Sequence, residues 1–227
     1  METMTTSIIL PFLVFFPFLG AVISYIIGRS NKGARDIWCW ILSAVIFIAS
    51  LTLIGKETVY SLRGFCGLGL SFAADGFGVI LAVLTGAIWL ITTIFSKEYM
   101  AAERNRNRYY FFVFLTLGAT MGIFLSADLF TTFIFFEIMS FTSFVLVMHD
   151  EEDFTVRSAK TYLAVAVIGG LVTLMGLFMM YQKAGTLNMT ELTAFMQSRE
   201  NPAEFYAISV LILFGFAAKA GLFPLHI

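Results

Sequence analysis

Apolar residues form seven long runs along this chain, separated by shorter segments that hold most of the charged side chains. Each run is about twenty residues long, and a helix needs about 20 apolar residues to cross the hydrocarbon core of a bilayer. The pattern predicts an all-α, polytopic transmembrane bundle of about seven helices in a single domain, residues 1–227. The expected spans are 7–28, 37–55, 76–96, 109–127, 129–148, 161–181 and 205–223.

Three shorter features stand out between these runs. Residues 57–75 contain several glycines and alternate apolar with polar positions, which predicts a β-hairpin. Residues 190–197 have the spacing of a short amphipathic helix. Asp128 directly precedes the fifth span, and this position favours a helix N-cap over a proton-carrying role.

The composition agrees with insertion into a membrane. Of the 227 residues, 59% are hydrophobic and 13% are charged, whereas soluble domains carry about 25% charged residues. The 14 basic and 15 acidic residues nearly balance, which argues against nucleic acid as a partner. Two cysteines, Cys39 and Cys66, are too few for a disulfide or metal framework. We expect an integral membrane protein.

The basic residues predict the orientation of the spans. Nine lie in the first, third and fifth connections, and four lie in the second and sixth. Because cytoplasmic loops carry the excess of Lys and Arg, the N-terminus is expected outside.

Two charged residues fall inside the predicted spans, where a charge costs about 2.5–3.5 kcal/mol on insertion scales. Glu137 lies about 12 Å from the start of its helix, close to mid-membrane. Among its helix neighbours, Ser140 alone shares its face as a hydrogen-bonding group. Two interpretations stay open: a functional acid, or a protonated acid that joins two helices by a hydrogen bond.

Lys219 is the second intramembrane charge, and it follows fourteen uncharged residues. Pro224 comes five residues later, so the last helix is expected to break near Lys219–Pro224. Broken helices at membrane depth occur where they line a cavity. The alternative is a lysine near a helix end whose amine reaches the headgroups.

An acid and a base lie on separate helices, and neither has a nearby counter-charge on its own helix. The two are therefore candidates for an ion pair with each other. Burial disfavours the charge on both and pairing favours it, so a single proton can tip the balance, as a relay requires. Lys160, which opens the sixth span, is either an interfacial anchor or a further relay position. The histidine and four acids of residues 149–153 are consecutive and point in different directions, so we expect a solvated loop and no metal site.

The segments around the two charges resemble one membrane-protein family. This family comprises the antiporter-like proton-translocating subunits of respiratory complex I, of multisubunit (Mrp-type) sodium/proton antiporters and of membrane-bound, energy-converting hydrogenases. Residues 135–144 (FFEIMSFTSF) resemble its fifth helix, and residues 218–226 (AKAGLFPLH) resemble the lysine, proline and histidine motif of its seventh. Supporting matches lie at 74–77, 99–100 and 159–163.

The resemblance implies a larger fold of about fourteen helices with two inverted five-helix repeats. It implies that Glu137 and Lys219 form a proton-relay pair, with Lys160 and His226 as further relay positions. Subunits of this type hold no cofactor or redox centre, so electron transfer would belong to partner subunits. Because relatives continue past the motif in which this chain ends, we expect it to be the N-terminal half of such a protein, as a fragment or a split-gene product.

Three functions stay open at this point. The leading one is a proton-translocating membrane subunit, or its N-terminal part, of a complex I-like redox-driven pump with other membrane subunits as partners. The alternative is a sodium/proton antiporter subunit of the Mrp type, or the related hydrogenase subunit. The third is a structural fragment without transport activity. The first two use the same pair, so the transported ion, protons alone or also Na⁺, stays open.

Overall fold

The computed structural model describes residues 5–62, 64–65, 68–197 and 203–222. Contacts between its residues divide the chain into two compact units, Met1–Ser126 and Ala127–Ile227. The expectation of a single domain over residues 1–227 stays a prediction.

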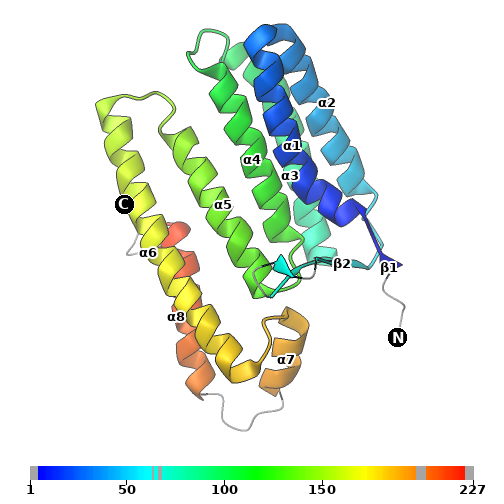
Figure 1. The fold of residues 1–227 in the computed structure, drawn as a ribbon, viewed down its shortest axis with the longest axis vertical. Coiled ribbons are helices and arrows are strands. Elements are labelled where there is room, and N and C mark those ends of the chain that lie inside the picture. The colour runs from blue at the N-terminus through cyan, green and yellow to red at the C-terminus, as the bar shows by residue number, and fades with distance from the viewer. Residues whose placement is uncertain (1–4, 63, 66–67, 198–202, 223–227) are drawn as a thin grey trace. The chain divides into compact units, whose positions relative to one another are not determined.

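The first unit is a bundle of four long helices with a small sheet at one end (Figure 1). Helix α1 packs against both α2 and α4, and α3 packs against α2 and α4. Its buried core is apolar and includes Leu13 and Val14 of α1, with Leu42 and Ile46 of α2. The elements are β1 (Thr5–Thr6), α1 (Ile9–Ser30), α2 (Lys32–Leu51), β2 (Thr58–Leu62), β3 (Leu70–Ala74), α3 (Gly76–Tyr99) and α4 (Arg106–Phe124).

The hairpin predicted over residues 57–75 is confirmed. Strands β2 and β3 pair antiparallel, with Thr58 opposite Ala74 and Leu62 opposite Leu70. The hairpin leads directly into α3, because the Asp75 side chain accepts a hydrogen bond of 2.7 Å from the backbone N–H of Gly78 and caps the helix. Strand β1 adds a parallel pair to β2, and its two residues are too short for any alternation to predict it.

The second unit consists of α5 (Leu129–Val147), α6 (Asp153–Ala184), α7 (Met189–Gln197) and α8 (Ala203–Lys219). Helix α6 packs against both α5 and α8, and Figure 1 shows α8 lying along α6. The short helix α7 confirms the prediction made for residues 190–197. The buried apolar core of this unit is Phe133, Leu177, Met180, Leu187, Leu192, Phe205, Ile208 and Ile212.

All seven predicted spans coincide with long helices. Among the described residues, α1, α2, α3, α5 and α6 are long and apolar enough to cross a membrane. Helix α4 begins with polar residues and α8 has 17 residues, so both fall short of that criterion. Large apolar side chains such as Ile80, Ile91 and Leu171 are more than 60% exposed, as expected of helices that face lipid. The chain is an integral membrane protein; its expected orientation stays a prediction.

Helix α6 is longer than its predicted span. Its 32 residues correspond to about 48 Å at about 1.5 Å per residue, whereas the hydrocarbon core is about 30 Å thick. The helix therefore continues for several turns outside the apolar run that predicted it.

Candidate functional site

Glu137 is positioned by a firmly capped helix. The side chain of Asp128 accepts hydrogen bonds from the backbone N–H and the hydroxyl of Thr131, at 2.7 and 2.6 Å, which confirms the predicted N-cap of α5. Glu137 follows about two and a half turns later, and Ser140 donates to the carbonyl oxygen of Phe136 at 2.8 Å. The hydroxyl that shares a face with Glu137 is thus used by its own helix.

Lys219 is the last residue of α8, and the local sequence ends the helix there. Gly221 has φ +64°, a left-handed conformation that glycine adopts without a steric cost. The N–H of Leu222 bonds to the carbonyl of Ala217 at 3.0 Å, and the N–H of Gly221 bonds to that of Ala218 at 3.3 Å. These two bonds form a Schellman motif, a common end of an α-helix. The helix therefore ends where a break was predicted, whereas Pro224 lies outside the described residues.

The structure brings the two intramembrane charges together. The amine of Lys219 donates a hydrogen bond to Oε1 of Glu137, and the two side chains form an ion pair between α8 and α5. The Lys219 side chain is 4% exposed and that of Glu137 is 23% exposed. A lysine that reached for the headgroups would be exposed and unpaired, so the buried ion pair favours a position at membrane depth over that alternative.

Glycines in α6 make room for this pairing. A Cβ atom on Gly170 would lie 2.5 Å from Oε1 and 2.9 Å from Oε2 of Glu137, so the carboxylate occupies the space that a side chain would fill. One residue earlier, a Cβ on Gly169 would lie 2.9 Å from the carbonyl oxygen of Gly215 in α8. Small residues let membrane helices approach closely. Helix α6 therefore lies close enough to both neighbours for their charges to meet beside it.

Aromatic rings complete the surroundings of the lysine. The amine of Lys219 lies 4.7 Å from the ring centroid of Phe136, the residue before Glu137. Phe136 in turn packs edge to face against Phe216 of α8, with centroids 4.9 Å apart. The ring face stabilises a cation by about 0.5–2 kcal/mol while keeping polar atoms away from it.

A pair of this kind is stable only while both charges are present. Breaking a buried pair by removal of one partner costs about 3–5 kcal/mol, because the remaining charge loses its compensation. The arrangement can therefore store and release a proton, since a proton gained by the carboxylate removes the partner on which the ammonium depends.

Comparison with known proteins identifies the family. Residues 126–227, which include both members of the pair, match the family described as "NADH:quinone oxidoreductase/Mrp antiporter, TM". This part of the chain belongs to the NADH:quinone oxidoreductase/Mrp antiporter family.

Relatives of the NADH:quinone oxidoreductase/Mrp antiporter family match over most of this chain. It is 30% identical over 158 residues to a Na(+)/H(+) antiporter subunit of Alkalihalophilus pseudofirmus, covering 70% of this chain and 32% of the relative. It is 29% identical over 230 residues to a Na(+)/H(+) antiporter subunit of Bacillus subtilis, covering 98% and 46%. The chain spans less than half the length of these curated relatives.

Two solved structures share the fold of this chain. One is the membrane-bound sulfane sulfur reductase, an archaeal respiratory membrane complex, with a TM-score of 0.85 and 21% identity over 96% of this chain and 46% of the other. The second is the Mrp complex from Dietzia sp., with a TM-score of 0.79 and 23% identity over 96% of this chain and 41% of the other.

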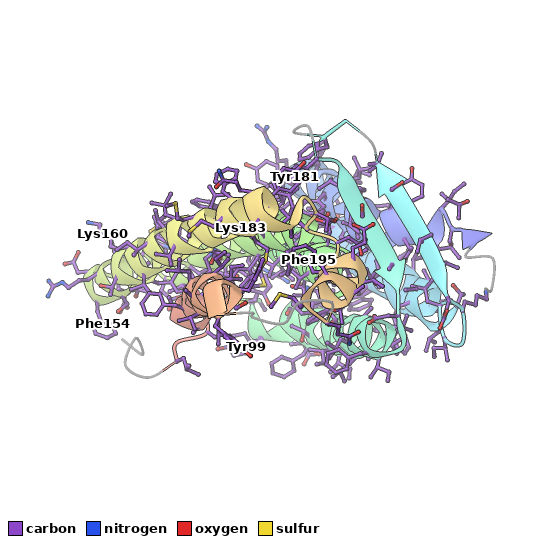
Figure 2. The ribbon with its side chains drawn as sticks, turned by 90° about the horizontal axis from the view of Figure 1, so that it is seen from below. Tyr99, Phe154, Lys160, Tyr181, Lys183 and Phe195 are labelled. Carbon is purple, nitrogen blue, oxygen red and sulfur yellow. The ribbon has the colours of Figure 1, made fainter. Side chains whose placement is uncertain are left out.

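The two further relay positions implied by the resemblance, Lys160 and His226, are not part of the observed ion pair. Lys160 is exposed, and Figure 2 shows it toward one end of α6 with Lys183 toward the other. No hydrogen bond or ion pair joins Lys160 to another described residue, and it precedes Gly170 by ten residues, or about 15 Å along the helix. His226 lies outside the described residues, as does Cys66. Relay roles for Lys160 and His226 stay predictions.

Sequence reasoning missed one side chain near the pair. Tyr162 of α6 lies near Ser140 and Ser143 on α5 and near Glu137. It belongs to the segment 159–163 that matches the family motif, but a tyrosine in an apolar run gives no signal of a polar contact. The hydroxyls of these three residues extend the polar surroundings of Glu137 along the α5 and α6 contact.

Sequence reasoning also missed two buried charges in the first unit. Arg35 and Asp36 of α2 are 1% and 5% exposed, although the predicted spans 7–28 and 37–55 left them in the connection between two helices. Asp36 accepts hydrogen bonds from Arg35 at 2.7 and 3.1 Å and from Arg106 of α4 at 3.3 Å. Helices α2 and α4 begin at Lys32 and Arg106, earlier than the apolar runs 37–55 and 109–127, so these charged residues belong to packed helices.

Proposed function

We propose that this chain is an antiporter-like membrane subunit that moves protons through Glu137 and Lys219, within a multisubunit sodium/proton antiporter of the Mrp type. The observation that carries the proposal is the intramembrane ion pair between α5 and α8. Relatives named as Na(+)/H(+) antiporter subunits support the antiporter alternative better than the redox-driven pump that led the sequence interpretation. Protons and Na⁺ are the proposed transported ions, and other membrane subunits are the proposed partners.

The proposed cycle uses one proton at a time. A proton reaches Glu137, the more exposed member of the pair, and neutralises the carboxylate. The Lys219 ammonium is then a buried charge without a counter-ion, which is unfavourable in an apolar surrounding. It releases a proton to the next acceptor on the path. The Glu137 carboxyl then transfers its proton to the neutral amine, which restores the ion pair after one proton has passed.

The test uses Glu137→Gln in the complete assembly in inverted membrane vesicles. The amide keeps the shape of the side chain but neither ionises nor carries a proton, so sodium-dependent collapse of a pH gradient should fall by about a hundredfold. Glu152→Gln is the matched control, because Glu152 is exposed at the start of α6 and its loss of charge should leave transport unchanged. Undiminished transport by the Glu137→Gln assembly would remove the pair from the proton path.

The same vesicles separate the antiporter from the redox-driven alternative. An antiporter is driven by a sodium gradient alone, so the pH change should follow added Na⁺ without any electron donor. Proton movement that requires oxidation of a donor and ignores the sodium gradient would replace the antiporter proposal by the redox-driven one.

A further inference from the structure

The first unit contains a cavity of about 1030 Å³ at the end where α2 and α4 begin. Five cationic side chains line it, together with one acidic side chain, Glu103. Both connections that contribute to it, the first and the third, are expected in the cytoplasm. The cations are Lys32, Arg35, Arg104, Arg106 and Arg108.

Acidic side chains balance part of the positive charge that lines this cavity and leave the rest uncompensated. Asp36 is the single acid that pairs with Arg35 and Arg106 among the described residues. Lys32 and Arg104 are exposed, and no hydrogen bond or ion pair joins either of them to another residue in the part of the chain that the structure describes. The cavity therefore presents an excess of cationic donors.

The start of α4 adds backbone donors to the same cavity. Asn105 precedes the helix with φ +60° and makes no side-chain capping bond, and the first turn contains no acidic residue. The first N–H groups of an α-helix have no partner within the helix, and together with the helix dipole they favour an anion. Asn105 and the residues that open the helix line the cavity.

Aromatic side chains also line the cavity. Tyr25, Phe111 and Phe112 line it, and the rings of Tyr25 and Phe111 pack edge to face at 5.7 Å. On α1, Val22 and Tyr25 share a face three residues apart and are 46% and 42% exposed. A ligand with an anionic head and an apolar tail would satisfy both the cationic and the aromatic side chains, whereas a free anion would leave the aromatic ones uncovered.

We propose that this cavity binds the phosphate-bearing headgroup of an anionic membrane lipid, with the acyl chains along the exposed apolar face of α1. Basic pockets between transmembrane helices on the cytoplasmic side are suited to such headgroups. Arg forms bidentate hydrogen bonds with phosphate oxygens, and Lys supplies a point charge. A zwitterionic headgroup brings its own cation, which would be repelled by the excess of basic side chains.

The test measures lipid binding by the purified full chain in detergent, and it does not depend on transport. All three tryptophans lie in the first unit, at Trp38, Trp40 and Trp89, so their fluorescence follows its thermal unfolding. Phosphatidylglycerol, phosphatidylcholine with the same acyl chains, and inorganic phosphate are titrated separately. We expect phosphatidylglycerol to raise the Tm and to stay bound in native mass spectrometry, with a weaker effect of the other two.

The decisive variant is Lys32→Gln combined with Arg104→Gln, because both side chains are exposed and the fold without lipid should be unaffected. Each charge-assisted hydrogen bond that is lost should weaken phosphatidylglycerol binding by about tenfold. Lys56→Gln, a few residues beyond the other end of α2, and Arg157→Gln, in the second unit, are matched controls that should bind as the unchanged chain does.

Three results would overturn the proposal. Equal stabilisation by phosphatidylcholine would show that the headgroup charge is not recognised. Unchanged affinity of the double variant, or an equal loss in the two controls, would show that basic residues act diffusely at the membrane surface and form no site. A full Tm shift with inorganic phosphate alone would show that the ligand is a free anion and not a lipid.

Discussion

The two units of this protein both bury charged side chains, but they hold them in different ways. In the second unit, Lys219 and Glu137 depend on each other for charge compensation. In the first unit, Asp36 serves two arginines, and Arg35 also donates to Asn107 and lies 4.7 Å from the ring centroid of Tyr110. One arrangement is a pair and the other is a network.

The difference decides what a single proton can do. Protonation of one carboxylate removes the counter-charge of Lys219, an amine that can give up its own proton. A proton on Asp36 would leave two guanidinium groups that do not deprotonate in proteins, with their other hydrogen bonds still in place. We interpret the pair as a switch and the network as a fixed connection between helices α2 and α4.

The largest effect is expected in the network. Asp36→Ala leaves Arg35 buried without its counter-charge, so the first unit should lose about 3–5 kcal/mol of stability. Tryptophan fluorescence measures this loss as a lower Tm. Asp36→Asn keeps hydrogen-bonding capacity without the charge, so its Tm should fall between those of Asp36→Ala and the unchanged chain. A Tm unchanged by Asp36→Ala would show that the network contributes nothing to folding.

Lys219→Arg should have the next largest effect, and it should act on transport. Arg keeps the positive charge and can still pair with Glu137, but it does not release a proton at physiological pH. Transport by the complete assembly should fall by about a hundredfold, with little change in thermal stability. The comparison between pair and network would fail if Lys219→Arg transported normally.

Gly170→Ala sharpens the comparison by moving the pair without removing it. The added methyl group would lie 2.5–2.9 Å from the carboxylate of Glu137, so the carboxylate must shift away from its present position. A displacement of about 1 Å can cost up to about a hundredfold in a proton-transfer step, and we expect a transport loss of about tenfold. Gly76→Ala is the control, because nothing lies within 4 Å of its Cβ position.

The smallest effects are expected from the two aromatic rings, which lie at the same distance from a cation. Phe136→Leu removes the ring 4.7 Å from the Lys219 amine and should lower transport about two- to fivefold. Tyr110→Leu removes the ring 4.7 Å from the Arg35 guanidinium and should lower the Tm of the first unit by a few degrees, with transport retained. An effect of Phe136→Leu on stability alone would argue against a dynamic role for the pair.

Much of the fold could be predicted from the sequence. The apolar runs located every long helix, because a bilayer accepts little besides continuous apolar helices with satisfied backbone groups. The hairpin before α3 and the cap at Asp128 followed from turn and capping chemistry, which acts between residues close in sequence. Strand β1 could not be predicted, since its partner β2 lies about fifty residues away and determines the pairing.

The buried network shows where pattern reasoning fails. Arg35 and Asp36 lie between two apolar runs, so hydropathy placed them in the connection between two helices. They are buried because helix α2 begins at Lys32 and because Arg106 and Asn107 of α4 meet them there. Contacts between residues about seventy positions apart leave no periodic signal in the chain.

The amino-acid sequence by itself determined that this protein crosses a membrane, which residues form its helices, and that an acid and a base lie at membrane depth. These properties depend on the free energy of transferring side chains from water to the bilayer and on hydrogen bonds between residues close in sequence. Both are determined by each segment separately. Only the tertiary structure decided that Lys219 meets Glu137, that Gly170 leaves space for the carboxylate, and that five cations surround one cavity. Those outcomes depend on how closely helices distant in sequence approach, and that distance is set by packing.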